Sequence, residues 1–337
     1  MTRVGAAPAK NIKNATTLTN MRHLISLKEQ SKQDLQTILD LAVKLKRKRN
    51  KGELTNFLQN KTLIMLFQKT STRTRLSFEA AMTELGGHGI FLDSRTSQFS
   101  LTSFEDEIQA IMRFGEVLMF RALKVQEVEK AASLNIIPVI DACSEKYHPS
   151  QTLGDILTMM EYSKGLKNIK KVAWLGTQNN VSNTLKLACA KLGIKITIIS
   201  PEADKASVDE ALNAQADATG LVTYTTDIKK GLEDADYVHT DTWVNMEFFD
   251  NGKIKPEFKQ EYERRLKIFK PYQLNVGLMQ KYAPKAKIMH CMPCHVGYEI
   301  TEEAINSQNS IIFDQAENRM HVEKAIILWL LNQENLL

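Results

Sequence analysis

Short apolar runs alternate with amphipathic helical segments along most of the chain. The run Thr62-Leu63-Ile64-Met65-Leu66-Phe67 is continuous enough to form a strand that is buried on both faces of a parallel sheet. Residues 34–43, which precede it, repeat apolar side chains at helical spacing. Further strands are expected at 89–92, 117–120 and 136–140. The first half of the chain therefore predicts a parallel α/β sheet.

The second half of the chain repeats this plan. Strands are expected at 171–175, 195–199, 221–224, 235–239 and 286–290. Residues 151–162 are typical of a helix that bridges the halves, and a final helix is apolar on more than one face. The pattern predicts two doubly wound α/β domains with parallel central sheets, joined by interdomain helices. We expect domains at 1–150 and 151–315, with a C-terminal helix of about 316–337 packing back on the first.

Composition and charge narrow the class of protein. A chain of 337 residues favours two domains of about 150 residues each. Its 43% apolar and 25% charged residues are ordinary for a globular protein, and a formal charge of +5 is too small and scattered to favour nucleic acid. No apolar run approaches the roughly 18 residues of a membrane span, and the first twenty residues lack the apolar core of a signal peptide. We expect a cytoplasmic protein without membrane or nucleic-acid partners.

One cysteine-rich segment has several interpretations. It is His290-Cys291-Met292-Pro293-Cys294-His295, which matches patterns of covalent haem attachment, of a redox pair and of half a zinc site. The other cysteines, Cys143 and Cys189, stand alone, and adjacent residues rarely share one tetrahedral ion. With no export signal, disulfides and covalent haem attachment are disfavoured. We therefore expect no metal at this segment.

The first predicted strand leads into a hydroxyl-rich and arginine-rich helix start. This segment is Ser71-Thr72-Arg73-Thr74-Arg75. Unpaired N–H groups and the positive dipole end make a helix N-terminus an anion site, whereas arginine in the first turn is unfavourable unless an anion neutralises it. The segment lacks the Gly-x-x-x-x-Gly-Lys of a nucleotide loop, so a single phosphate group fits better. The alternative is capping by Thr70 or Ser71 with solvated arginines.

Polar residues also follow other strands of the first half. Arg121 ends strand 117–120, and His148 with Gln151 opens the bridging helix. Ligands of such folds lie beyond the carboxyl ends of the strands, which favours a shared site. The alternatives are an arginine that leaves for solvent and an ordinary loop histidine.

Strand ends of the second half carry amides and a carboxylate. Strand 171–175 leads to Gly176-Thr177-Gln178-Asn179-Asn180, which lacks Gly-x-Gly-x-x-Gly and so gives little support to dinucleotide binding. Asp241 follows strand 235–239 and could accept an amine or a cation. The anion-binding residues of the first half, together with the amides and carboxylate of the second half, predict an anionic phosphate compound that meets an amine between two domains.

Five spaced motifs resemble the aspartate/ornithine carbamoyltransferase family, and its ornithine branch most closely. In the family's order they are Ser71-Thr72-Arg73-Thr74-Arg75, His148-Pro149-x-Gln151, the loop from Asp241 to Met246, His290-Cys291-x-Pro293 and Ala316-Glu317-Asn318-Arg319. The resemblance spans roughly residues 22 to 334. It implies transfer of the carbamoyl group from carbamoyl phosphate to ornithine, giving citrulline and phosphate. It also implies a homotrimer, or a multiple of trimers, without metal or organic cofactor.

The resemblance assigns roles residue by residue. Carbamoyl phosphate would be bound by Ser71, Thr72, Arg73, Thr74, Arg121, His148, Gln151, Cys291, Met292 and Arg319. Ornithine would be bound by Asn180, Asp241, Asn245 and Met246. The catalytic residues would be Cys291, Arg121, His148 and Asp241, with Arg121 and His148 polarising the carbamoyl group. In this scheme Asp241 and a Cys291 thiolate orient the amine.

Three departures from the family pattern concern the acceptor amine. Where the ornithine branch has Ser-Met-Gly, this chain has Asn245-Met246-Glu247, followed by a longer, charged loop over 247–269. Val296 stands where an arginine is often found, and Ser97-Gln98-Phe99-Ser100 replaces a short His-Leu-Gly segment. Another amine such as putrescine, or a non-catalytic member of the family, is therefore an alternative.

Overall fold

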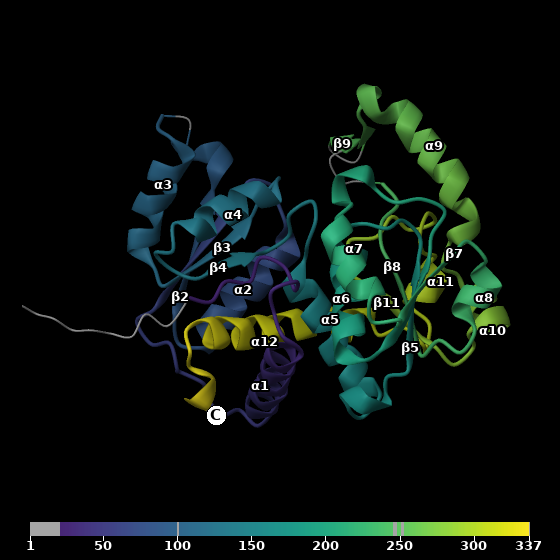
Figure 1. Cartoon of the computed structure of the whole chain (residues 1–337), viewed down its shortest axis with the longest axis horizontal. Helices are drawn as coiled ribbons and strands as arrows, with labels where there is room; N and C mark the ends of the chain where they lie inside the picture. The colour runs from purple at the N-terminus through teal and green to yellow at the C-terminus, as the bar shows by residue number, and fades with distance from the viewer. Residues whose placement is uncertain (1–20, 100, 245–247, 251–252, 337) are drawn as a thin grey trace, which may run out of the picture.

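The computed structural model describes residues 21–99, 101–244, 248–250 and 253–336. Two α/β lobes lie side by side, with helix α5 (Pro149–Tyr162) between them (Figure 1). Each lobe contains one parallel sheet, with strand orders β2-β1-β3-β4 and β11-β8-β5-β6-β7. The predicted fold class, two parallel α/β domains joined by interdomain helices, is confirmed.

The first sheet follows the predicted strands closely. Its strands are β1 (Thr62–Phe67), β2 (His88–Asp93), β3 (Val117–Arg121) and β4 (Val139–Asp141). The helices of this half are α1 (Lys32–Asn50), α2 (Thr72–Glu84), α3 (Phe104–Ile111) and α4 (Val125–Ser133). Strand β4 is shorter than the predicted 136–140, because Pro138 has no N–H to pair and β4 pairs with β3 only from Val139.

The second sheet is also parallel throughout. Its strands are β5 (Lys171–Leu175), β6 (Lys195–Ile199), β7 (Val222–Thr225), β8 (Tyr237–Thr240) and β11 (Lys287–His290). Its helices are α6 (Asn180–Leu192), α7 (Glu210–Asp217), α8 (Ile228–Leu232), α10 (Val276–Tyr282) and α11 (Glu302–Ile305).

The segment 247–269, expected as a charged loop, contains regular structure. Strands β9 (Phe249–Asp250) and β10 (Lys253–Ile254) form a short antiparallel pair, and helix α9 (Lys259–Phe269) follows. Trp243, Phe248 and Phe269 belong to a small hydrophobic cluster of this region. Aromatic residues form most of the buried apolar cluster of this region. The many charged residues of the segment make this apolar content hard to recognise in the sequence.

Two helices connect the lobes. Pro149 occupies the first turn of α5, where its missing N–H costs nothing. Helix α12 (Ile312–Leu330) packs against α1, α2 and α5, and it is buried on more than one face, as its sequence predicts. The domain boundaries at residues 150 and 315 remain our prediction. No helix in the described part of the chain is long and apolar enough to cross a membrane.

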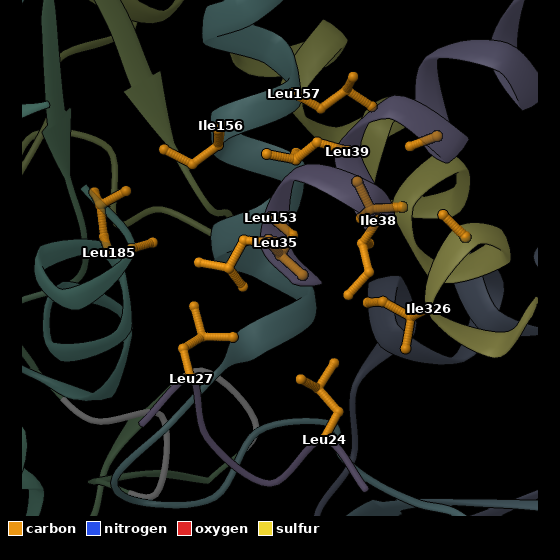
Figure 2. Close-up of a cluster of buried hydrophobic side chains, with 14 of the residues drawn as sticks. Leu24, Leu27, Leu35, Ile38, Leu39, Leu153, Ile156, Leu157, Leu185 and Ile326 are labelled. Atoms are coloured by element: carbon orange, nitrogen blue, oxygen red, sulfur yellow. The ribbon is translucent and has the colours of Figure 1, made fainter. Parts of the chain in front are cut away.

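The largest hydrophobic cluster lies at the seam between the lobes (Figure 2). Aliphatic side chains of α1, α5, α6 and α12 converge there, each at most 1% exposed: Leu35, Ile38, Leu39, Leu153, Ile156, Leu157, Leu185 and Ile326. Burying one such side chain contributes about 1.5–3 kcal/mol. The seam therefore fixes how the two sheets, and the residues at their strand ends, sit relative to one another.

Candidate active site

Strand pairing gathers the predicted residues at one edge of each sheet. In the first sheet, Phe67 at the end of β1 lies opposite Arg121 at the end of β3. In the second sheet, His290 at the end of β11 lies opposite Thr240 at the end of β8. Cys291 and Asp241, which follow these two residues, are consequently neighbours.

The start of α2 has the form of an anion site. Ser71, rather than Thr70, is the N-cap, and its side chain accepts a hydrogen bond from the backbone N–H of Thr74 at 3.3 Å. The first turn contains no acidic residue to balance the helix dipole. Thr72 is exposed at the first helical position.

Three arginines gather at this helix start: Arg73 from its own first turn, Arg121 from β3 and Arg319 from α12. Nη1 of Arg121 and Nη2 of Arg319 each donate to Oγ1 of Thr74 at 3.2 Å. Burial lowers the pKa of Arg73; the negative charge of Asp241 opposes this effect, whereas the positive charges of Arg319 and Arg121 reinforce it. Arg73 therefore interacts with both other arginines and with a strand end of the second sheet. Three like charges held this close favour an anion between them.

Three buried nitrogens at this place have no hydrogen-bond partner within the described part of the chain. They are Nε of Arg121, Nε of Arg319 and Nδ1 of His148. Leaving a buried polar group unpaired costs about 1–3 kcal/mol each. A ligand with several oxygen atoms would satisfy the two arginine donors and lower this cost.

His148 is held as a neutral imidazole at the start of α5. Its backbone N–H donates to Oγ1 of Thr184 in α6 at 3.0 Å, so the second lobe helps to place it. Burial lowers its pKa well below 6.5, and the charges of Arg319 and Arg121 lower it further. One turn later, Nε2 of Gln151 donates to Oδ1 of Asp155 at 2.8 Å.

Asp241 and Cys291 form a hydrogen-bonded pair in the second lobe. Sγ of Cys291 donates to Oδ1 of Asp241 at 2.9 Å, and Nδ2 of Asn179 donates to Oδ2 of Asp241 at 2.6 Å. Burial raises the pKa of Cys291 well above 9, and the neighbouring carboxylate raises it further. The family resemblance led us to expect a thiolate, whereas burial and the neighbouring Asp241 favour the thiol form.

The segment from His290 to His295 is organised by hydrogen bonds to a buried glutamate. Nδ1 of His290 accepts from the backbone N–H of Met292 at 2.8 Å, and its Nε2 lies 3.3 Å from Oε1 of Glu299. The same carboxylate oxygen accepts from the backbone N–H of His295 at 2.6 Å. Asp241, His290 and Cys291 offer metal-ligand atoms within 4.8 Å of one another, but these atoms are engaged in the internal hydrogen bonds above.

The remaining predicted residues are placed differently. Nδ2 of Asn180 donates to the carbonyl oxygen of Ser144 at 2.8 Å and lies 3.2 Å from Sγ of Cys143, so Asn180 joins the two lobes. Asn245 and Met246 lie outside the described residues. The assignment of all these residues to ligand binding stays a prediction.

Sequence reasoning missed residues that support the site. Nε2 of Gln315 donates to Oδ1 of Asp155 at 2.7 Å, and its Oε1 accepts from the backbone N–H of His290 at 2.9 Å. Gln315 thus connects the carboxylate behind Gln151 to the strand that ends at His290. Asp155 lies one helical turn after Gln151, a spacing that could have indicated it. Gln315 has no comparable spacing from a predicted site residue that could have indicated it.

An arginine-lined strand edge facing a carboxylate and a thiol defines a two-domain enzyme that brings an anionic donor to an amine. Residues 22–161 match the carbamoyl-P binding domain of aspartate/ornithine carbamoyltransferase, and residues 168–330 match its Asp/Orn binding domain. The chain belongs to the aspartate/ornithine carbamoyltransferase family.

Individual relatives resemble nearly the whole chain. The ornithine carbamoyltransferase of Methanosarcina acetivorans is 39% identical over 311 residues, which cover 92% of this chain and 99% of the relative. That of Archaeoglobus fulgidus is 39% identical over 316 residues, covering 94% and 99%. The solved ornithine carbamoyltransferase from Pyrococcus furiosus superposes with a TM-score of 0.83 at 35% identity, over 91% of this chain and 96% of that one.

Proposed function

We propose that this chain transfers the carbamoyl group of carbamoyl phosphate to the side-chain amine of ornithine, giving citrulline and phosphate. One observation carries the proposal: three arginines lie across from a paired carboxylate and thiol, and two of them have a buried N–H group with no partner among the described residues. The relatives named ornithine carbamoyltransferase support ornithine as the acceptor, rather than another amine or a non-catalytic role. The proposed reaction uses no metal or organic cofactor.

The phosphate group of the donor would lie at the start of α2. Ser71, Thr72, Arg73 and Thr74 would bind its oxygens, and Arg319 would close on it from α12. Backbone N–H groups at a helix N-terminus and charged guanidinium groups are strong partners for phosphate. Phosphate departs as an anion, so the same groups stabilise the leaving group.

The carbamoyl group would lie against Arg121, His148 and Gln151. Nε of Arg121 and the neutral imidazole would polarise the carbonyl oxygen and stabilise the negative charge that develops on it. Since Nε2 of Gln151 is bound to Asp155, we assign Oε1 as the acceptor for the carbamoyl NH2 group. Met292 would add a backbone contact.

The amine would lie beside Asp241 and Cys291. An alkylamine with a pKa near 10.4 is almost wholly protonated at neutral pH, so it must lose a proton before attack. The Asp241 carboxylate would hold the ammonium form, replacing the hydrogen bond from Cys291. Asn180, Asn245 and Met246 would bind the rest of the amino acid.

Atoms and charges balance in this transfer. The deprotonated amine nitrogen attacks the carbonyl carbon, and the tetrahedral intermediate expels phosphate as the bond from carbon to the bridging oxygen breaks. Relative to the ammonium form, two N–H protons are lost. One is found on the product HPO4²⁻ and the other passes to solvent.

The acceptor is tested by phosphate release from carbamoyl phosphate with ornithine, putrescine, lysine, N-acetylornithine or aspartate. We expect ornithine to give the highest kcat/KM, although Asn245, Glu247 and Val296 depart from the family pattern. A higher value with putrescine would move the assignment to that amine. Background release with all five would refute carbamoyl transfer.

We further propose a homotrimer, or a multiple of trimers, in the cytoplasm. Large apolar side chains are exposed on neighbouring elements of the first lobe, with Leu76 on α2 at 59% and Ile90 on the edge strand β2 at 41%. The four cysteines are free thiols, as a reducing compartment favours. Light scattering should give about three times 38.2 kDa, or a multiple of it. A monomer at micromolar concentration would contradict the trimer.

A further inference from the structure

A buried carboxyl group lies behind the anion site and has no part in the proposed transfer. Glu323 of α12 is fully buried, and its Oε1 accepts a hydrogen bond from Nη2 of Arg319 at 3.1 Å. The same Nη2 donates to Thr74 at the start of α2. Glu323 therefore holds one end of the guanidinium, while Nε of Arg319 has no partner in the described chain.

Within the described part of the chain, one cation and two hydroxyls act on the carboxyl group of Glu323. Arg319 faces it from its own helix, Ser77 from α2 and Ser150 from α5. Oε2 makes no hydrogen bond of ordinary geometry within the described residues. Burial raises the pKa of Glu323 to about 7, although Arg319 acts in the opposite direction. The ionised carboxyl group thus depends on a single cationic partner.

That partner is the group a phosphate ligand would also use. A dianion bound to Arg319 competes for its N–H groups and adds two negative charges near the carboxylate. A like charge in buried surroundings favours the protonated form of a carboxyl group. Binding of the dianion should therefore make ionised Glu323 less stable than neutral Glu323.

We propose that Glu323 is a positioning residue for Arg319, and that its carboxylate takes up a proton from solvent when a dianion binds at this guanidinium. The identification of the natural dianion as carbamoyl phosphate rests on the proposed function. The neutral carboxyl group still offers a carbonyl oxygen to Nη2 of Arg319. Its new O–H has the Ser77 and Ser150 oxygens beside it as acceptors.

Other groups near the anion site whose pKa is clearly shifted titrate mostly outside the range from pH 6.5 to pH 8.5. The pKa of His148 is well below this range, and that of Cys291 is well above it. Asp141 is the exception, since burial raises its pKa to about 7. This second buried carboxyl group ends β4, outside the proposed ligand contacts, and provides a matched control.

The test of proton uptake uses sulfate, which stays a dianion throughout this pH range. Calorimetric titration of the full chain, in buffers of different ionisation enthalpy, measures both affinity and protons taken up. We expect the wild-type affinity to fall about fivefold from pH 6.5 to pH 8, with net proton uptake. Glu323→Gln should abolish both effects, and Asp141→Asn should preserve them. A pH dependence that survives in Glu323→Gln, or vanishes in Asp141→Asn, would overturn the proposal.

The positioning role predicts a second difference. Glu323→Gln keeps an acceptor oxygen for Arg319, whereas Glu323→Leu removes it. At pH 6.5 we expect the leucine variant to raise the KM for carbamoyl phosphate by about tenfold or more, and the glutamine variant to stay within about twofold of wild type. Equal KM values in both variants would contradict the role. If the leucine variant does not fold, the sulfate titration of Glu323→Gln still decides the proposal.

Failure of the coupling to Glu323 can be distinguished from failure of the proposed function. Sulfate binding is measured without ornithine and without turnover. A protein that binds sulfate with proton uptake but releases no phosphate would refute carbamoyl transfer alone. A protein that turns over but binds sulfate without proton uptake would refute only the coupling to Glu323.

Discussion

The hydroxyl of Thr74 receives hydrogen bonds from Arg121 and Arg319, which are separated by almost two hundred residues in the chain. Neither contact neutralises the guanidinium charge, and each arginine keeps a buried Nε without a partner in the described chain. The site is therefore organised before a ligand arrives. Such preorganisation lets the same charges stabilise a transition state without first being moved.

Replacement of Arg73 tests the anion site at the residue scale. Arg73→Ala should lower kcat/KM by about 100-fold or more, on the order of 3 kcal/mol, because one of the positive charges that stabilise the departing phosphate is lost. The control is Arg75→Ala, since Arg75 is exposed on the same helix and pairs with Glu79. Steady-state phosphate release measures both variants. Near-normal activity of Arg73→Ala would refute the assigned role.

The protonation state of the Cys291 side chain can be tested by its rate of alkylation. Because its pKa is raised, its alkylation by iodoacetamide at pH 7.5 should be more than tenfold slower than that of free cysteine, and should accelerate only above pH 9. Asp241→Asn removes the neighbouring negative charge and should speed the reaction. Mass spectrometry of the peptide gives the rate for this cysteine alone. Alkylation at the rate of free cysteine would show a thiolate instead.

At the scale of elements, α12 joins the two lobes through Gln315. Its side chain bonds to Asp155 of α5 and to the backbone N–H of His290 in β11. Gln315→Leu leaves both groups short of a partner in a buried place, which costs about 1–3 kcal/mol for each unpaired group.

We therefore expect Gln315→Leu to lower both the free energy of unfolding and kcat, although Gln315 itself is no predicted ligand contact. Urea unfolding and steady-state kinetics measure the two effects. Gln308→Leu, at an exposed position shortly before α12, is the control. Unchanged kcat in a destabilised Gln315→Leu protein would confine the residue to a structural role.

Elements could be predicted where burial alone determines them. The runs 62–67, 171–175 and 195–199 are continuous because both faces of a central strand are covered, and their limits were predicted to the residue. The predicted start of strand β4 was too early, because apolar character alone does not show that Pro138 cannot donate a hydrogen bond to β3. Helix α9 was missed because its charges outweigh the few aromatic residues that bury it.

The predicted residues at the strand ends come together because parallel strands share a carboxyl edge, a rule the sequence can apply. The hydrogen bond of Gln315 with Asp155 follows from how α12 lies against α5, whereas Glu323 pairs with Arg319 one turn away on α12 itself. The first joins residues 160 positions apart. No local pattern predicts this long-range contact, whereas the i,i+4 spacing of Arg319 and Glu323 could have indicated the second pair.

At the scale of the whole molecule, buried carboxyl groups make stability depend on pH. The pKa of Asp141 is about 7 in the folded state, against 3.8 in the unfolded chain. Between these values the unfolded state releases its proton while the folded state keeps it. Stability is therefore lost as pH rises toward 7, by about 1.4 kcal/mol per pH unit.

Asp141→Asn should remove this dependence. The free energy of unfolding of the variant minus that of wild type should rise by about 2–3 kcal/mol from pH 5 to pH 8, whatever this difference is at pH 5. Urea unfolding at the two pH values measures this, with Asp40→Asn at an exposed position of α1 as control. A difference between variant and wild type that does not change with pH would contradict a buried, neutral Asp141.

The most direct test of the central claim follows the transferred group itself. The purified chain is mixed with carbamoyl phosphate labelled with ¹³C at the carbonyl carbon and with unlabelled ornithine, and the carbon signal is followed by NMR. We predict that the label moves to the ureido carbon of citrulline, with one phosphate released for each citrulline formed. Phosphate release without labelled citrulline, or an unchanged carbamoyl phosphate signal beyond its spontaneous decay, would contradict the account.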